Sequence, residues 1–224
     1  MDAAGEVVTR VALVALVALA ACGKSKAESE REAKCRLAST SAADYMRVLI
    51  QHVQRSAPMP PEEKAFDEAP QGDPDRVFLE TSLVESSQLQ TAWLDVERAH
   101  SAALAAAREP MTKELTDVAK AFDGVVDPAG AARRALDQVA KLEAIEGKRA
   151  ADLHAISTKQ AALLARMDTK IAAGIKDEQL GADLAALRKT VELAVEAGQL
   201  SEKLPDSYAV DKLALEDVIK SCAK

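Results

Sequence analysis

The chain has 224 residues, and its 36 acidic and 29 basic side chains give a formal net charge of −7. Only 3% of the residues are aromatic, and an acidic chain with so few stacking side chains lacks the features typical of nucleic-acid binding. The length suffices for one domain with its own core. The abundance of strong helix formers, above all alanine and leucine, predicts an all-α protein.

The first element in the chain is a short apolar segment, Val11 to Ala21, which ends at a cysteine and is followed at once by charged residues. It is far shorter than the roughly 20 residues that a helix needs to cross a bilayer. Its length is typical of the hydrophobic region of a secretory signal peptide. Its end, Leu19-Ala20-Ala21-Cys22, resembles the lipobox of bacterial lipoproteins, in which Leu, a small residue, Ala or Gly, and Cys follow one another.

The resemblance to bacterial lipoproteins implies a diacylglyceryl group on the Cys22 thiol, cleavage before Cys22 and acylation of the new amino terminus. Residues 1–21 are then the signal peptide, residues 22–30 a lipidated tether, and the mature chain carries a formal charge of −6. It also implies attachment to a membrane of the cell envelope through the N-terminal lipid. Gly23, which is not aspartate, favours the periplasmic face of the outer membrane over the inner membrane.

Two alternatives stay open at this end of the chain. Asp2 and Glu6 precede the first basic residue, Arg10, although the start of a signal peptide is normally positive. Translation from Val8 instead would remove both acids and leave the same mature chain. The apolar segment can also be read as a core helix that happens to end at Cys22, but the lipobox resemblance favours the signal peptide.

Beyond the tether, residues 31–224 are predicted to form one helical bundle domain with a Pro-rich loop at 56–74. Apolar residues spaced three and four apart predict its helices, and proline, glycine or capping residues bound them. The stripes place Tyr45 and Leu83 among the core residues, and Pro110 is expected to break or kink the second helix. The predicted helical segments are 28–54, 74–123, 128–173 and 177–222.

Two of these segments contain a weak point. Gly147 lies where the apolar stripe of 128–173 fades, and a glycine inside a helix costs about 1 kcal/mol relative to alanine. Pro205 interrupts 177–222, and Asp206 and Ser207 provide a new helix cap directly after it. We therefore expect local weakness at both positions.

The lengths of the segments predict how they pack. The last three have 46–50 positions each, and a helix of about 45 residues is about 68 Å long. Rods of equal length joined by short turns must pack antiparallel. We predict an elongated up-down-up-down bundle, in which the first helix and the Pro-rich loop form the first pass. The alternative is a three-helix, spectrin-like bundle with the first helix packed on its side.

The two remaining cysteines are predicted to form a disulfide. Cys35 lies near the start of the first helix and Cys222 at the end of the last, and an up-down-up-down bundle brings these two ends together. Both lie on apolar stripes, and an exported protein meets an oxidising compartment in which disulfides persist. The alternative is a pair of buried free thiols.

The search for a chemical site yields one weak candidate. Glu97 and His100 have the Glu-x-x-His spacing that occurs twice in ferritin-like bundles with paired metals, but the chain has only this copy. A metal site needs several converging ligands, so we expect neither a metal nor another cofactor. No catalytic residues are predicted either, because no nucleophile lies in a recognisable catalytic setting.

The sequence therefore predicts a non-enzymatic, lipid-anchored protein of the cell envelope. It would act through contacts with an envelope protein or as a spacer. Met59 and Phe66 in the Pro-rich loop are the candidate contact residues, since long loops are either functional or simple connectors. The alternative function is a periplasmic binding module that holds a small ligand or a metal in the bundle core, which requires a cavity with converging polar groups.

Overall fold

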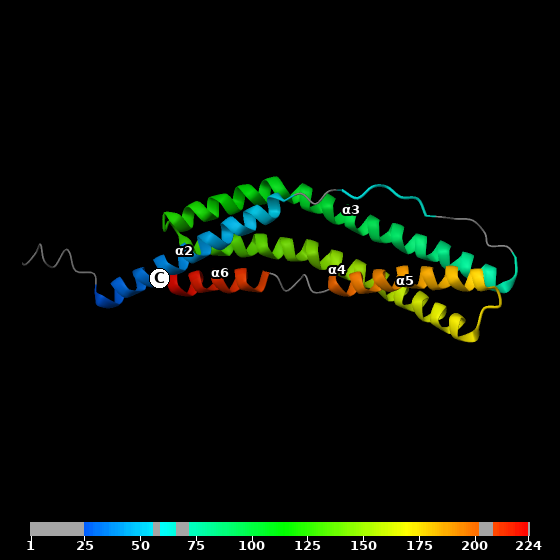
Figure 1. Ribbon diagram of the computed structural model, residues 1–224. Coiled ribbons are helices and arrows are strands. Elements are labelled where there is room, and N and C mark those ends of the chain that lie inside the picture. Colours follow the sequence, from blue (N-terminus) through cyan, green and yellow to red (C-terminus); the bar gives the residue numbers. More distant parts are fainter. Residues whose placement is uncertain (1–24, 56–58, 66–71, 202–207, 224) are drawn as a thin grey trace, which may run out of the picture.

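The structure of the protein is a computed structural model that describes residues 25–55, 59–65, 72–201 and 208–223. The described residues form helices and no strand. The helices are α2 (Lys26–Gln54), α3 (Pro74–Asp123), α4 (Pro128–Ala173), α5 (Glu178–Ser201) and α6 (Ala209–Cys222), shown in Figure 1. None of the described helices is both long enough and apolar enough to cross a membrane.

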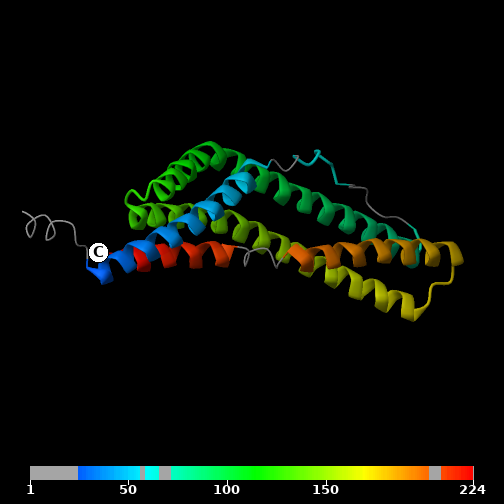
Figure 2. The same ribbon diagram turned by 60° about the vertical axis from the view of Figure 1, so that its left-hand side comes forward.

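The helices form an elongated antiparallel bundle, which confirms the predicted fold class. The chain runs along α2 and the Pro-rich segment, returns along α3, runs back along α4 and returns again along α5 and α6, as the two views in Figures 1 and 2 show. The last pass consists of two helices in line rather than one. Residues 202–207, which include the predicted interruption at Pro205 and the cap at Asp206 and Ser207, lie outside the described residues.

The two ends of the bundle differ in cross-section. In one half, α2 and α6 pack against the C-terminal part of α3 and the N-terminal part of α4; we call this the four-helix half. In the other, the three-helix half, α5 packs against the remaining parts of α3 and α4. A four-helix arrangement therefore describes one half and a three-helix arrangement the other. The reason is that α2 ends at Gln54 and covers only part of α3.

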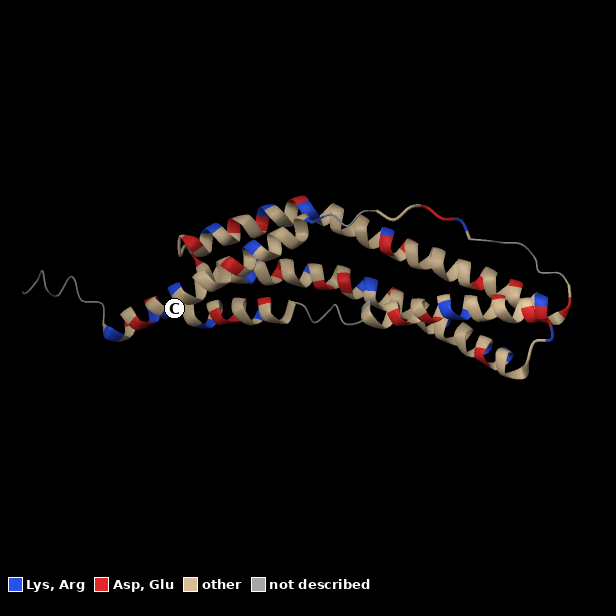
Figure 3. Cartoon of the chain, viewed as in Figure 1, with Lys and Arg blue, Asp and Glu red and all other residues tan. Residues whose placement is uncertain are grey.

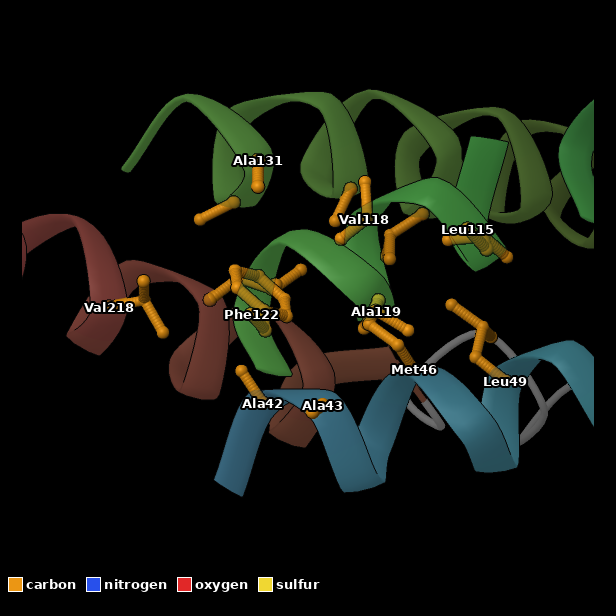
Figure 4. Close-up of a cluster of buried hydrophobic side chains, with 14 of the residues drawn as sticks. Ala42, Ala43, Met46, Leu49, Leu115, Val118, Ala119, Phe122, Ala131 and Val218 are labelled. Carbon is orange, nitrogen blue, oxygen red and sulfur yellow. The ribbon is translucent and has the colours of Figure 1, made fainter. Parts of the chain in front are cut away.

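Each half has its own apolar core. Small alanines of α2 and α4 line the core of the four-helix half, and Phe122 of α3 is buried among them with 1% of its surface exposed (Figure 4). The small side chains let the backbones approach, and the large ring fills the space that remains. The core of the three-helix half is built from leucines of α3, α4 and α5 around the fully buried Met167.

Most helices begin and end where the local signals predict. Asp73, Asp127 and Asp177 each accept a hydrogen bond from a backbone N–H of the first turn that follows. These bonds satisfy donors that a helix start leaves unpaired. The helix α3 continues through Pro110, and Figures 1 and 2 show it bent near the end of α2.

Three sequence-based predictions need correction. Tyr45 is 37% exposed, whereas its neighbour Met46 is fully buried. The helix α2 packs against both α3 and α6, so the side of α2 that faces the core includes Met46 rather than Tyr45. Leu83 is 43% exposed, since it lies on α3 in the half that has no fourth helix. The helix α2 begins at Lys26, inside the segment that we expected to be a tether.

Candidate functional site

The end of the bundle at which the described chain begins is closed by the predicted disulfide. Cys35 of α2 and Cys222 of α6 are bonded, with their Cα atoms 4.8 Å apart. The Ser39 hydroxyl lies 3.8 Å from the sulfur of Cys222. The bond ties the first helix of the bundle to the last, which confirms the pairing predicted from the topology.

The start of α2 extends past this disulfide. Residues 25–34 are helical from Lys26 onward, exposed on all sides, and lie beyond the other helices (Figure 1). Ser25 and Glu28 form a capping box, in which each side chain binds the backbone N–H of the other residue. The predicted lipidation site, Cys22, lies outside the described residues, three positions before this cap.

A hollow of about 670 Å³ lies beside this exposed start of α2. It is lined by the disulfide, by Val125 in the turn between α3 and α4, and by residues at both ends of the chain such as Arg31 and Ala223. It is open to the solvent and lies at the end of the bundle. Its place suits a contact with a neighbouring surface rather than an enclosed ligand.

The metal candidates Glu97 and His100 lie at the middle of the bundle, where they face two residues of α4. Glu97 accepts two hydrogen bonds from Arg149, at 2.6 and 2.9 Å, and His100 Nε2 lies 3.0 Å from Glu146 Oε1. All four side chains are at least three-quarters buried. We call these four residues the central polar layer, and it separates the two apolar cores.

The contacts of the central polar layer identify it as a structural ion-pair layer. Both oxygens of Glu97 are used by Arg149, and the bond with Glu97 raises the pKa of that guanidinium. Within the described ranges, no group of three or more His, Cys, Asp or Glu side chains is arranged to hold a metal ion. The Glu-x-x-His spacing thus brings together the Glu97–Arg149 ion pair and the His100–Glu146 contact across one helix interface.

A second set of polar residues adjoins this layer from α2 and α6. The Tyr208 hydroxyl lies 3.4 Å from His52 Nε2, at the junction before α6. Burial, with the negative charges of Glu146, Asp211 and Glu143 adding to it, raises the pKa of Tyr208 to about 12. Burial also raises the pKa of Asp211. We did not predict from the sequence that these residues lie together. The one signal in the sequence was the weakening of the apolar stripe of 128–173 near Gly147, next to Glu146 of the central polar layer.

Packing is loose around the central polar layer. Between Leu89 and Met111, no side chain of α3 is fully buried. A hollow of about 260 Å³ lies between α3 and α4 at this level, lined mainly by alanines and other apolar groups. The charged residues on its wall already have partners: His100 and Arg149 bind carboxylates in the layer, and Lys148 binds Asp152 at 2.6 Å. Each of these three residues thus already has a partner within the protein.

The described part of the Pro-rich loop follows α3. Arg98 donates a hydrogen bond to the carbonyl oxygen of Pro61 at 3.2 Å. Met59 is 63% exposed and remains a candidate contact residue, whereas Phe66 lies outside the described residues. The loop is thus held against the bundle by at least one side chain.

No protein family, no curated protein and no solved structure matches this chain.

Proposed function

We propose that the protein is a lipid-anchored, non-enzymatic component of the bacterial cell envelope that acts as a spacer or through contacts with another envelope protein. The observation that carries the proposal is the position of Cys22, directly before the folded bundle. Only two residues separate it from the Ser25 cap, and the Cys35–Cys222 bond then joins the first and last helices. A lipid at Cys22 would hold the whole bundle by one end.

The shape and the interior of the bundle support a mechanical role. The helix α4 has 46 residues, which corresponds to a length of about 69 Å. Apolar side chains fill both cores, and the mostly buried Glu97 and Arg149 of the middle are paired with each other. Both signs of charge are interspersed along the helices in Figure 3, as expected of a surface in contact with water.

Intact-mass measurement of protein extracted from membranes tests the proposal. We expect a chain that begins at Cys22, carries the mass of a diacylglyceryl group and a fatty acyl chain, and gains two hydrogens on reduction. The matched variant, Cys22→Ser, should accumulate uncleaved or leave the detergent phase. An unmodified chain with residues 1–21 still attached would overturn the proposal.

A further inference from the structure

The four-helix half has four seams between neighbouring helices, and they differ in chemistry. The seams α2–α3, α3–α4 and α4–α6 are each bridged near the surface by an ion pair: Arg47–Asp123, Arg134–Glu114 and Lys212–Glu143. The seam α2–α6 is joined by the Cys35–Cys222 disulfide at one end and by the His52–Tyr208 contact at the other. Between these two points, exposed aliphatic and aromatic side chains lie beside polar residues such as Ser41 and Asp217.

Five large apolar residues flank this seam, and each has more than a third of its surface exposed. We call them the α2–α6 apolar face; they are Leu37 (70% exposed), Tyr45 (37%), Val48 (65%), Val210 (55%) and Leu213 (65%). Exposed apolar residues are common singly, but a row of them along one seam marks an interaction surface.

Helical spacing and a shallow groove place these residues on the same side. Leu37 lines a groove of about 330 Å³ between α2 and α6, opposite Ala214 and Asp217. Val48 lies eleven positions after Leu37, which is three helical turns, and so points to the same side of α2. On α6, Val210 lies four positions before Ala214 and shares its side. The groove thus lies between the exposed apolar residues of α2 and those of α6.

We propose that the α2–α6 apolar face lies against the lipid surface to which Cys22 is attached. This inference rests on the proposed function, because it takes the lipid at Cys22 as given. Three residues of extended chain span about 10 Å, so the Ser25 cap must lie within about that distance of the lipid. From Lys26 to Leu37 the helix rises only about 17 Å. A membrane that holds the lipid at Cys22 is therefore close enough to contact the α2–α6 apolar face.

The composition of the face suits a lipid interface. Tyr45 is amphipathic, and tyrosine is enriched at membrane–water boundaries. The two charged residues of the groove, Lys34 and Asp217, have opposite signs, so the groove adds no net charge to repel anionic headgroups. With this face down, the four-helix half would lie on the membrane, and the three-helix half, which is built on the same helices α3 and α4, would continue away from the anchored end.

The test uses the chain from Cys22 onward, which retains all described residues. With the disulfide formed, Cys22 is its one free thiol, because the sequence has three cysteines. That thiol is coupled to a maleimide lipid in vesicles of brominated phosphatidylcholine, whose bromines quench tryptophan. In a Trp93→Phe background, Leu213→Trp reports on the face. The matched control is Leu193→Trp on α5, where the native leucine is 54% exposed.

We expect anchoring to brominated vesicles to remove about half or more of the emission of the Leu213→Trp protein and to shift it to the blue, since interfacial helices bury their apolar face about 5–10 Å deep. The Leu193→Trp protein should change little. Adding Leu37→Ser and Val48→Ser should abolish the quenching at position 213 while the protein stays attached.

Other outcomes would overturn the inference. Equal quenching at both positions, or quenching at neither, would exclude a specific membrane-facing side. A blue shift without quenching that grows with protein concentration would assign the face to a second copy of the chain. Because the coupling is chemical, the result does not depend on acylation in the cell. A protein that is acylated but unquenched removes only this inference, whereas an unmodified Cys22 in cells removes the proposed function.

Discussion

Single residues already decide how closely the helices of this bundle approach. Two of the glycines inside helices, Gly147 of α4 and Gly198 of α5, have opposite surroundings. A Cβ atom added at Gly147 would meet nothing within 4 Å, whereas one added at Gly198 would lie 2.5 Å from the Cβ atom of Ser157. Gly198 is thus required by the contact between α5 and α4, and Gly147 only weakens α4.

The two glycines should therefore respond oppositely to alanine. Gly147→Ala is expected to raise the free energy of unfolding by about 1 kcal/mol, because alanine favours the helix and meets no obstacle. Gly198→Ala is expected to lower it by about 1–3 kcal/mol, because Ser157 and the backbone must shift. Urea denaturation followed by circular dichroism measures both, and changes of the same sign would contradict the structure.

Tyr208 should make the fold sensitive to alkaline pH. Its pKa is raised from 10.0 to about 12, so the folded state favours the neutral phenol. The stability contributed by the neutral phenol is fully present below pH 10 and is lost as the pH rises from 10 to about 12. The loss amounts to about 3 kcal/mol.

Ultraviolet titration of the phenolate checks this prediction. The chain has two tyrosines, and we expect the Tyr208→Phe variant to lose the step near pH 12. The same variant should unfold with a weaker dependence on pH between 10 and 12. A wild-type protein that shows no phenol titration step near pH 12 would contradict the burial of Tyr208.

At the scale of the helices, the central polar layer lies where α3 has no fully buried side chain, between Leu89 and Met111. The bidentate pair of Glu97 and Arg149 joins the two helices where apolar contacts are few, and both side chains are less than a quarter exposed. A partly buried pair of this kind gains little net stability, but the loss of one partner leaves an uncompensated charge.

A double-mutant cycle tests this account of the layer. Glu97→Leu or Arg149→Met alone should lower the free energy of unfolding by about 1–3 kcal/mol, because each leaves a polar group without its partner. The double variant, Glu97→Leu with Arg149→Met, should be nearly neutral because no charge remains unpaired. Additive losses in chemical denaturation would show that the two residues do not act as a pair.

At the scale of the whole molecule, the disulfide decides whether the four-helix half stays closed. It links positions 187 residues apart, and the loop-entropy estimate for so long a loop is about 5 kcal/mol. The core of the three-helix half contains no residue of α2 or α6. Opening the disulfide should therefore affect the two halves unequally.

We expect the Cys35→Ser and Cys222→Ser double variant to unfold about 2–5 kcal/mol more easily than the oxidised protein. Hydrogen exchange should show the loss of protection first in α6, which is short and is held at its C-terminal end by the bond. The reduced wild-type protein is the control and should behave like the variant. Uniform loss of protection in α5 and α6 would mean that the two halves unfold as one unit.

Much of the fold follows from short-range signals in the sequence. Asp73 with Pro74 and Asp127 with Pro128 determine where α3 and α4 begin, because a cap and a proline act within one turn. The equal lengths of the segments and their short turns imply the antiparallel order. The disulfide could be predicted because it depends only on that order.

Tertiary structure alone decided which groups meet across the helices. The helix α2 packs against both α3 and α6, and its rotation about its own axis buries Met46 and exposes Tyr45. The spacing of apolar residues in the sequence could not decide between these two neighbours. Glu97 meets Arg149, 52 positions later in the chain, and this pairing depends on the relative shift of α3 and α4 along their axes. Local propensity sets where a helix starts and ends, but packing of complete helices sets their shift and rotation, and with them the partners of each side chain.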